Sequence, residues 1–285
     1  MVEYGFHLRK NGYRESSIDR SVRILRRLSK YCNLEDTEAV KAYLSTLDWC
    51  LGTKEIASNV LDSFYKLQGV PFSKPRYRRV DKLPFLPNEG EIDLLIGGCS
   101  KRVASFLQFL KETGARAGEA WAVKWTDLDL DQRTVRITPE KNSNPRQLRL
   151  SPRLVEMLGT LPKDSLKVWR DGTLNHFGRL FQKSRKRIAT KSGNPRIQAI
   201  HFHTLGHWKG STEYHKTKDL VYVSRLLGHK NIGNTLKYIQ LQVSDDDSFI
   251  CKAAKSLSDV TGLVESGFDY VCNLEDGTQI FRKRK

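Results

Sequence analysis

The chain has 285 residues and carries 49 Lys and Arg against 32 Asp and Glu, a formal net charge of 49 − 32 = +17. Hydrophobic residues make up 39% of it, enough to build folded cores, which excludes a wholly disordered protein. No apolar run approaches the ~18 residues that a membrane span needs, and the first residues lack a signal-peptide layout. The five scattered cysteines form no CxxC pair, which argues against a disulfide framework or a thiolate zinc site.

These properties predict a cytoplasmic protein with a strong positive field. Such a field usually serves nucleic acid, because each phosphate that Lys or Arg neutralises releases a counterion. A basic surface kept only for solubility is the alternative interpretation.

Residues 1–70 are expected to form a small helical domain. Apolar residues at steps of three and four predict a helix over 17–31, and two further helices are predicted with Asp36 or Thr37 and Thr53 as N-caps. The first of these helices carries a second, basic stripe at the same period, made of Arg20, Arg23, Arg27 and Lys30. We interpret this stripe as a DNA-contacting face, with an ordinary solvated face as the alternative.

Residues 71–87 change character, because four prolines break any helix there. Positive charge is crowded between these prolines, at Lys74, Arg76, Arg78, Arg79 and Lys82. We interpret the segment as an extended linker that can follow a phosphate backbone, with a plain charged spacer as the alternative.

Residues 88–285 are expected to form a second, mostly helical domain with a small antiparallel sheet. Asn88 and Glu91 form a capping-box pattern, and a later helix ends at Thr113-Gly114. Alternating patterns predict one hairpin with a polar tip over 134–150 and another around Asp276-Gly277. Helical patterns occupy residues 154–158, 175–188 and 202–238.

Three segments of this domain are rich in side chains that handle phosphate. Arg116 follows a helix-ending glycine and opens the next helix, where its guanidinium and nearby backbone N–H groups favour anions, and Glu119 can hold the guanidinium from behind. The second segment runs from residue 201 to 207 and contains three histidines. The third contains His229, followed nine residues later by Tyr238.

Metal binding is a rival interpretation, because His203 and His207 share one helix face. However, the chain has no HExxH pattern, and no carboxylate or cysteine completes a ligand set. We therefore expect no metal site. A serine hydrolase is also disfavoured, because no GxSxG pattern occurs.

Taken together, the segments resemble the tyrosine recombinase (phage-type integrase) family over residues 83–240. Arg116 matches the first arginine box, residues 203–207 resemble the second, and residues 226–238 resemble the third with its terminal nucleophile. Lys141, at the predicted hairpin tip, is placed like the family's catalytic lysine. The C-terminal hairpin looks more like archaeal integrases than bacterial ones.

The resemblance implies a helical core-binding domain followed by a catalytic domain, together closing around duplex DNA. Tyr238 would attack the scissile phosphodiester and form a 3′-phosphotyrosyl link, with Lys141 as general acid and His203 at the acid/base position. Arg116 and His229 would stabilise the charge that develops on the phosphate, and we expect His207 only to pack beneath the site.

The resemblance also implies the partners of the chain. These are double-stranded DNA and further copies of the chain, in a tetramer on paired sites, with no metal or nucleotide cofactor and no membrane. Such a protein would be associated with the nucleoid or encoded by a virus or plasmid. A type IB topoisomerase, which uses the same nucleophile, is one alternative.

Gly206 departs from the family pattern, because it stands where the family carries its second active-site arginine. Loss of one donor to a transition state typically costs about 10²–10³ in rate. We predict that the chain binds DNA but cleaves it slowly or not at all, and a decayed, non-catalytic integrase is the second alternative. Lys209, nearly one helical turn further on, is a candidate for partial replacement of the missing charge.

Overall fold

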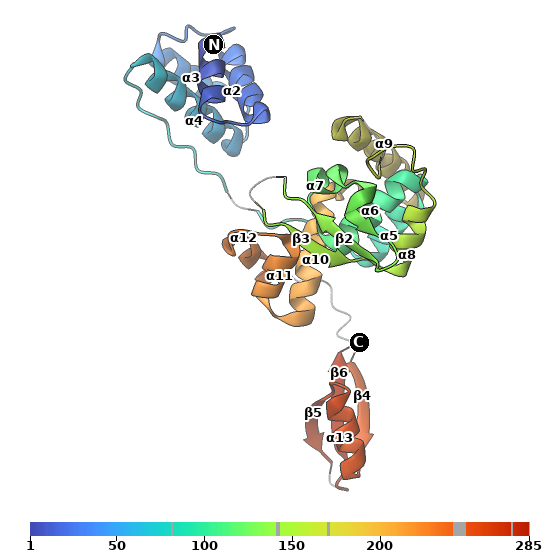
Figure 1. Cartoon of the computed structure of the whole chain (residues 1–285). Helices are drawn as coiled ribbons and strands as arrows, with labels where there is room; N and C mark the ends of the chain where they lie inside the picture. The colour runs from blue at the N-terminus through green and yellow to red at the C-terminus, as the bar shows by residue number, and fades with distance from the viewer. Residues whose placement is uncertain (81, 141–142, 170–171, 242–248, 275, 285) are drawn as a thin grey trace. The chain divides into compact units, whose positions relative to one another are not determined.

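The computed structural model describes the whole chain except residues 81, 141–142, 170–171, 242–248, 275 and 285 (Figure 1). The chain divides between Lys82 and Leu83 into two compact units. Within the second unit, the described residues that follow position 248 form a small fold with a core of its own. Among the described residues, no helix combines the length and the apolar character needed to cross a membrane.

The first unit is a bundle of four helices, which are α1 (Val2–Lys10), α2 (Glu15–Leu28), α3 (Thr37–Thr46) and α4 (Leu51–Gln68). The apolar stripe of α2 is buried in the core of this bundle, whereas its basic stripe is exposed. Asp36 caps α3 as predicted, since its carboxylate accepts from the N–H groups of Glu38 and Ala39. The predicted cap at Thr53 is wrong, because α4 already begins after Cys50.

Part of the predicted linker packs on this first unit. Phe72 and Tyr77 lie against its core, and the Ser58 hydroxyl donates to the carbonyl of Pro75 at 2.7 Å. Lys74 Nζ donates to the side chain of Asn59 at 3.0 Å. Residues 70–80 nevertheless form no helix or strand, as the prolines predict.

The second unit, up to residue 241, is built around α6 (Lys101–Thr113), which is buried along most of its length and packs against α5, α7, α8 and α10. The other elements of this part are α5 (Glu89–Gly97), α7 (Ala117–Ala122), α8 (Pro152–Gly159), α9 (Leu174–Ser192), α10 (Phe202–Thr217), α11 (Leu220–Leu227), α12 (Gly233–Leu236), three 3₁₀ turns (Trp125–Asp127, Pro195–Ala199 and Lys237–Ile239) and the strands β1 (Leu128–Asp129), β2 (Thr134–Ile137) and β3 (Arg146–Arg149). The three strands form an antiparallel sheet in the order β1-β2-β3. The fold class predicted from the sequence, mostly helical with a small antiparallel sheet, is confirmed.

Two glycines with a left-handed backbone conformation turn the chain at the predicted Arg116 and His229 motifs. Gly114 ends α6 with φ 60°, and the chain turns there so that Arg116 becomes the N-cap of α7. Gly228 ends α11 with φ 70°, which turns the chain toward His229. Other residues strongly disfavour this conformation, so these positions need glycine.

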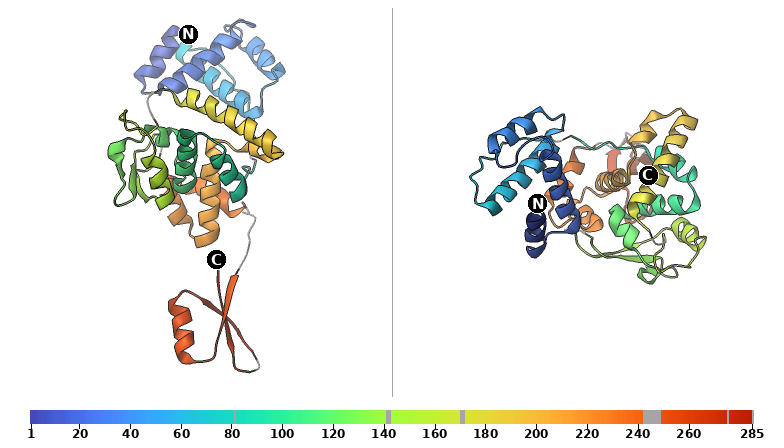
Figure 2. Two further views of the ribbon diagram at one scale, coloured as in Figure 1. Left: turned by 90° about the vertical axis from the view of Figure 1, so that its right-hand side faces the viewer. Right: turned by 90° about the horizontal axis from the view of Figure 1, so that it is seen from above.

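Residues 249–284 form a second antiparallel sheet with one helix. Its elements are β4 (Phe249–Ala254), α13 (Leu257–Glu265), β5 (Asp269–Asn273) and β6 (Gln279–Arg284), and the strand order is β4-β6-β5. Helix α13 lies against the sheet (Figure 2, left). Val260 and Leu263 of α13 pack against the small core that contains Phe268 and Phe281. The sequence predicted the β5–β6 hairpin, but β4 and α13 were missed.

Candidate active site

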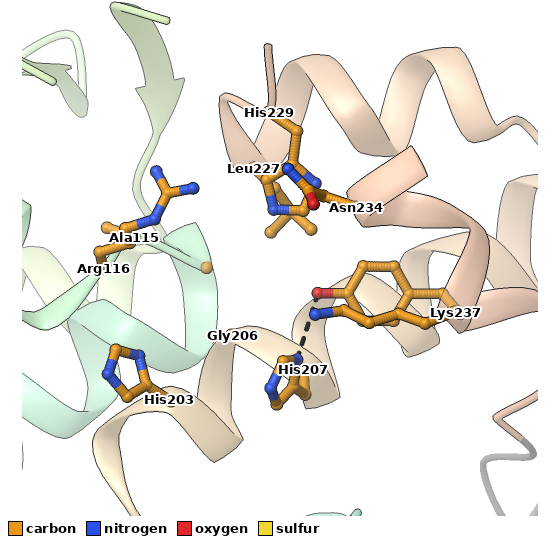
Figure 3. A pocket seen from close by; sticks show the side chains of 11 residues that line it. Ala115, Arg116, His203, Gly206, His207, Leu227, His229, Asn234 and Lys237 are labelled. Carbon is orange, nitrogen blue, oxygen red and sulfur yellow. Dashed lines mark hydrogen bonds between the residues drawn. The ribbon is translucent and has the colours of Figure 1, made fainter. Parts of the chain in front are cut away.

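One pocket of the second unit gathers residues from all three predicted motifs (Figure 3). It has a volume of about 290 Å³ and is lined by Gly114, Ala115, Arg116, His203, Gly206, His207, Leu227, His229, Asn234, Lys237 and Tyr238. The structure therefore brings together every candidate catalytic residue except Lys141, which lies outside the described residues. Gly206 lies on α10 between His203 and His207, in the middle of the pocket (Figure 3).

A buried carboxylate holds Arg116 in place. The Glu119 side chain is fully buried, and its Oε1 accepts from Arg116 Nη1 at 3.1 Å and from the Ser143 hydroxyl at 2.5 Å. Its Oε2 accepts from Arg146 Nη2 at 2.8 Å. Burial alone would raise the pKa of Glu119, but the hydrogen bonds from Ser143 and Arg146 outweigh it and hold that pKa below its usual value. The predicted support of Arg116 by Glu119 is thus present in the structure.

The same network joins the β2–β3 hairpin to the third motif. Ser143 pairs with His229 in an antiparallel bridge, and the backbone N–H of Asn144 donates to the carbonyl of Gly228 at 2.9 Å. The described end of the hairpin tip therefore contacts both the Arg116 and the His229 segments. Lys141 lies two positions before Ser143 in the chain.

Tyr238 is almost fully buried, with 2% of its surface exposed. Its hydroxyl lies 3.3 Å from Nδ1 of His207, and its ring is nearly parallel to the His229 ring at a centroid distance of 6.5 Å. Burial raises the pKa of the Tyr238 phenol above its ordinary value, and the Arg116 charge offsets only part of this effect. The phenol is therefore protonated at neutral pH, and it needs a proton acceptor to become a nucleophile.

Two half-buried imidazoles flank the phenol. Burial lowers the pKa of His207 to about 4, with a further contribution from the charge of Lys237. Burial also lowers the pKa of His229 to about 4, assisted by Arg116, and the Nδ1 atom of His229 lies 2.9 Å from the hydroxyl of Thr235. Both rings are therefore neutral at pH 7, and a neutral imidazole nitrogen can accept a proton.

His207 makes a contact with Tyr238 that the sequence did not predict. It was expected only to pack, yet it is the hydrogen-bond partner of the Tyr238 hydroxyl. The four-residue spacing of His203 and His207, which puts both on one face of α10, was the available signal in the sequence. His203 lines the same pocket and is exposed. Among the described residues, no group of three or more His, Cys, Asp or Glu is placed to hold a metal ion.

Position 206 has room for a Cβ atom. A Cβ atom on Gly206 would lie 3.5 Å from its nearest neighbour, the carbonyl oxygen of Gly114, which is an ordinary contact. Lys209, the sequence candidate for replacement of the missing charge, forms an ion pair with Glu213 at 2.8 Å and does not line the pocket.

The basic residues predicted to contact DNA all lie in the first unit and are exposed, namely Arg20, Arg23, Arg27, Lys30, Lys74, Arg76, Arg78 and Arg79. Arg27 stacks over the ring of Trp49 at 5.2 Å. Arg79 lies 3.5 Å from a carboxylate oxygen of Glu55. Their DNA contacts remain a prediction.

Comparison with known proteins agrees with this arrangement. Residues 88–245, more than half of the chain, match the family model described as the phage integrase family. The chain belongs to this family. The resemblance to tyrosine recombinases that the sequence motifs carry is thereby confirmed.

Several relatives are tyrosine recombinases by name. Tyrosine recombinase XerA of the archaeon Saccharolobus solfataricus is 25% identical over 197 residues, which cover 67% of this chain and 62% of XerA. A tyrosine recombinase of Thermosipho africanus is 24% identical over 218 residues, covering 74% of this chain and 73% of that protein. The chain thus spans less than two thirds of the length of XerA.

Solved structures share the fold. A lambda integrase dimer bound to a COC′ core site matches with a TM-score of 0.68 and 15% identity, covering 87% of this chain and 96% of that one. The Tn1549 transposon integrase in complex with transposon right end DNA matches with a TM-score of 0.65 and 15% identity, covering 84% and 94%. At these identities the likeness concerns the fold alone.

Proposed function

We propose that the chain is a site-specific DNA recombinase or integrase that cuts and rejoins duplex DNA through a 3′-phosphotyrosyl intermediate. Membership of the phage integrase family supports a DNA strand transferase. The observation that carries the proposal is the pocket in which the Tyr238 phenol lies with Arg116 and two neutral imidazoles. This combination offers a nucleophile, a proton acceptor and a clamp for phosphate oxygens.

In the proposed reaction the Tyr238 oxygen attacks the scissile phosphorus while the bond from phosphorus to the 5′-oxygen breaks. The phenol proton passes to a neutral histidine, and the geometry supports His207 as the immediate acceptor, with the exposed His203 linking the pocket to solvent. By its family position, Lys141 donates the proton that the leaving 5′-oxygen needs. The phosphotyrosyl bond conserves the energy of the broken bond, so rejoining requires no nucleotide cofactor.

Arg116 and His229 act on the phosphate itself in this proposal. The Arg116 guanidinium, held from behind by Glu119, can bind two non-bridging oxygens. The negative charge on these oxygens grows in the transition state, so preorganised donors there accelerate the reaction. A tetramer on paired sites would complete strand exchange, and a lambda integrase tetramer bound to a Holliday junction has the same fold at a TM-score of 0.66.

The absence of a side chain at Gly206 makes slow cleavage part of the proposal. It also favours the second candidate, a DNA-binding protein that no longer cuts. Because a Cβ atom at 206 makes only an ordinary contact with the backbone, a Gly206→Arg substitution tests the effect of the missing guanidinium.

Covalent capture decides between these functions. The chain is incubated with a library of labelled random-sequence duplexes, each nicked so that the short strand released by cleavage dissociates and traps the intermediate. We expect an adduct on denaturing gels that Tyr238→Phe abolishes and that Gly206→Arg increases by about 10²-fold. Absence of an adduct from both the parent chain and Gly206→Arg would make the chain a DNA binder. Relaxation of supercoiled plasmid without a defined site would indicate a topoisomerase instead.

A further inference from the structure

Lys237 is a cation of the pocket to which the family motifs assign no role. It lies in the 3₁₀ turn directly before Tyr238, its side chain is half-buried, and it lines the pocket (Figure 3). Its ammonium group lies 5.3 Å from the centroid of the Tyr238 ring. Among the described residues, its ammonium forms no hydrogen bond or ion pair.

The surroundings of Lys237 are positive. Burial lowers the pKa of its ammonium group, and the charge of Arg116 lowers it further. The carboxylate of Glu119, which also belongs to this site, is already occupied by Arg116, Arg146 and Ser143. A half-buried cation beside another cation, with no carboxylate bound to it, is stabilised by an incoming anion.

We propose that Lys237 binds the scissile phosphate and supplies part of the positive charge that is missing at position 206. The inference rests on the proposed function and adds a substrate-binding residue to it. Lys237 and Gly206 line the same pocket, so a cation at either position faces the same ligand. Lys237 also directly precedes Tyr238 in the chain. Its charge therefore lies close to the phosphate that the Tyr238 phenol would attack.

The replacement is partial for a chemical reason. An ammonium group acts as a compact point charge, whereas a guanidinium group can bind two phosphate oxygens at once. Lys209, the other lysine near position 206, is already neutralised by Glu213 and serves as a matched control.

A double-mutant cycle tests whether Lys237 replaces part of the charge missing at position 206. It uses the DNA site found by covalent capture. The rate of adduct formation is measured for the parent chain, Lys237→Ala, Gly206→Arg and the double variant. We expect Lys237→Ala to lower the rate about 100-fold in the parent chain but less than fivefold in the Gly206→Arg background, because two cations that serve one phosphate are not additive. Lys237→Arg should retain most of the parent rate, and Lys209→Ala should leave it unchanged.

Equal losses in both backgrounds, or no loss in the parent chain, would overturn the proposal. An adduct from Gly206→Arg but none from the parent chain would do the same, while leaving the proposed function intact.

A binding measurement separates the two proposals if no variant forms an adduct. Inorganic phosphate is titrated into each protein while the imidazole signals of the histidines are followed by NMR. We expect Lys237→Ala to weaken phosphate binding about tenfold and Lys209→Ala to leave it unchanged. Unchanged phosphate affinity in Lys237→Ala would refute the role of Lys237, whereas a tenfold loss without any adduct would refute only the recombinase.

Discussion

At the scale of single residues, the site combines a protonated phenol with neutral imidazoles that can accept its proton. Burial keeps the Tyr238 phenol protonated, and the same burial keeps His207 and His229 neutral. A protonated imidazole next to the phenol hydroxyl would have no lone pair to offer, so the lowered pKa of His207 is useful to the chemistry. Desolvation therefore acts on both partners of one proton transfer.

The half-buried His207 and His229 predict a pH-dependent stability. Their pKa values are about 4 in the folded chain, below the ordinary value of about 6.5, so the unfolded chain binds more protons in between. The free energy of unfolding should therefore fall as the pH drops from about 6.5 to 4, and it should be level near pH 7. Its slope against pH corresponds to the uptake of up to about one proton per histidine on unfolding. Urea denaturation at several pH values measures this.

A His207→Gln variant provides the control for that prediction. It removes one of the two titrating groups, so its slope should be about half that of the parent chain. A free energy of unfolding that does not change across this pH window would contradict the half-buried, neutral state of both imidazoles.

The residue types of the site were predictable, whereas some of their contacts were not. The resemblance to the tyrosine recombinase motifs pointed to Arg116, His203, His229 and Tyr238, and the structure places all four around one pocket. The contact between His207 and the phenol, and the access of Lys237 to the pocket, depend on how α10 packs against the turn that carries Tyr238. Such packing involves segments about thirty residues apart in the chain, and local periodicity carries no information about it.

At the scale of the elements, α10 lines the pocket with His203, Gly206 and His207 and packs against Tyr238. Gly210 on α10 lies against the Tyr238 ring, and a Cβ atom at that position would come within 2.6 Å of Cζ of the phenol. The absence of a side chain at 210 is therefore what lets the ring pack against the helix.

A Gly210→Ala substitution tests this close approach. Alanine in a helix interior is normally about 1 kcal/mol more favourable than glycine, so the helix alone predicts stabilisation. We expect the opposite, because the methyl group displaces the buried ring: thermal unfolding at a lower temperature and adduct formation reduced about 10- to 100-fold. A more stable and fully active Gly210→Ala variant would show that the ring does not rest on this position.

The start of a helix was predicted correctly where a side chain caps it, and wrongly where no side chain does. The pattern at Asn88 and Glu91 is a capping box in the structure, with the Asn88 N–H donating to Glu91 at 2.9 Å. Thr53 instead lies within the first turn of α4, and its hydroxyl contacts the Cys50 sulfur at 3.2 Å. The short β4 and α13 were missed because brief apolar runs fit a strand or a helix equally well.

At the scale of the whole molecule, the excess of 49 basic over 32 acidic residues predicts DNA binding dominated by phosphate contacts. We expect the affinity for duplex DNA to fall by at least about 10³ between 50 and 200 mM salt, as measured by fluorescence anisotropy. An affinity that barely changes over this range would contradict the electrostatic account.

Substitutions on α2 provide the control for this prediction. Replacing Arg20, Arg23 and Arg27 together by alanine should lower the slope of log affinity against log salt by about one for each phosphate that an arginine no longer neutralises. These side chains are exposed, so the change should leave the fold intact. An unaltered slope would show that the basic face of α2 does not bind DNA.

The central claim is that Tyr238 becomes joined to a DNA phosphate in the pocket that holds Arg116, His203 and His229. Mass spectrometry of the proteolysed covalent complex tests this most directly. We expect one modified peptide, with a nucleotide attached through its 3′-phosphate to the Tyr238 oxygen. A nucleotide on another residue, or one attached through a 5′-phosphate, would contradict it.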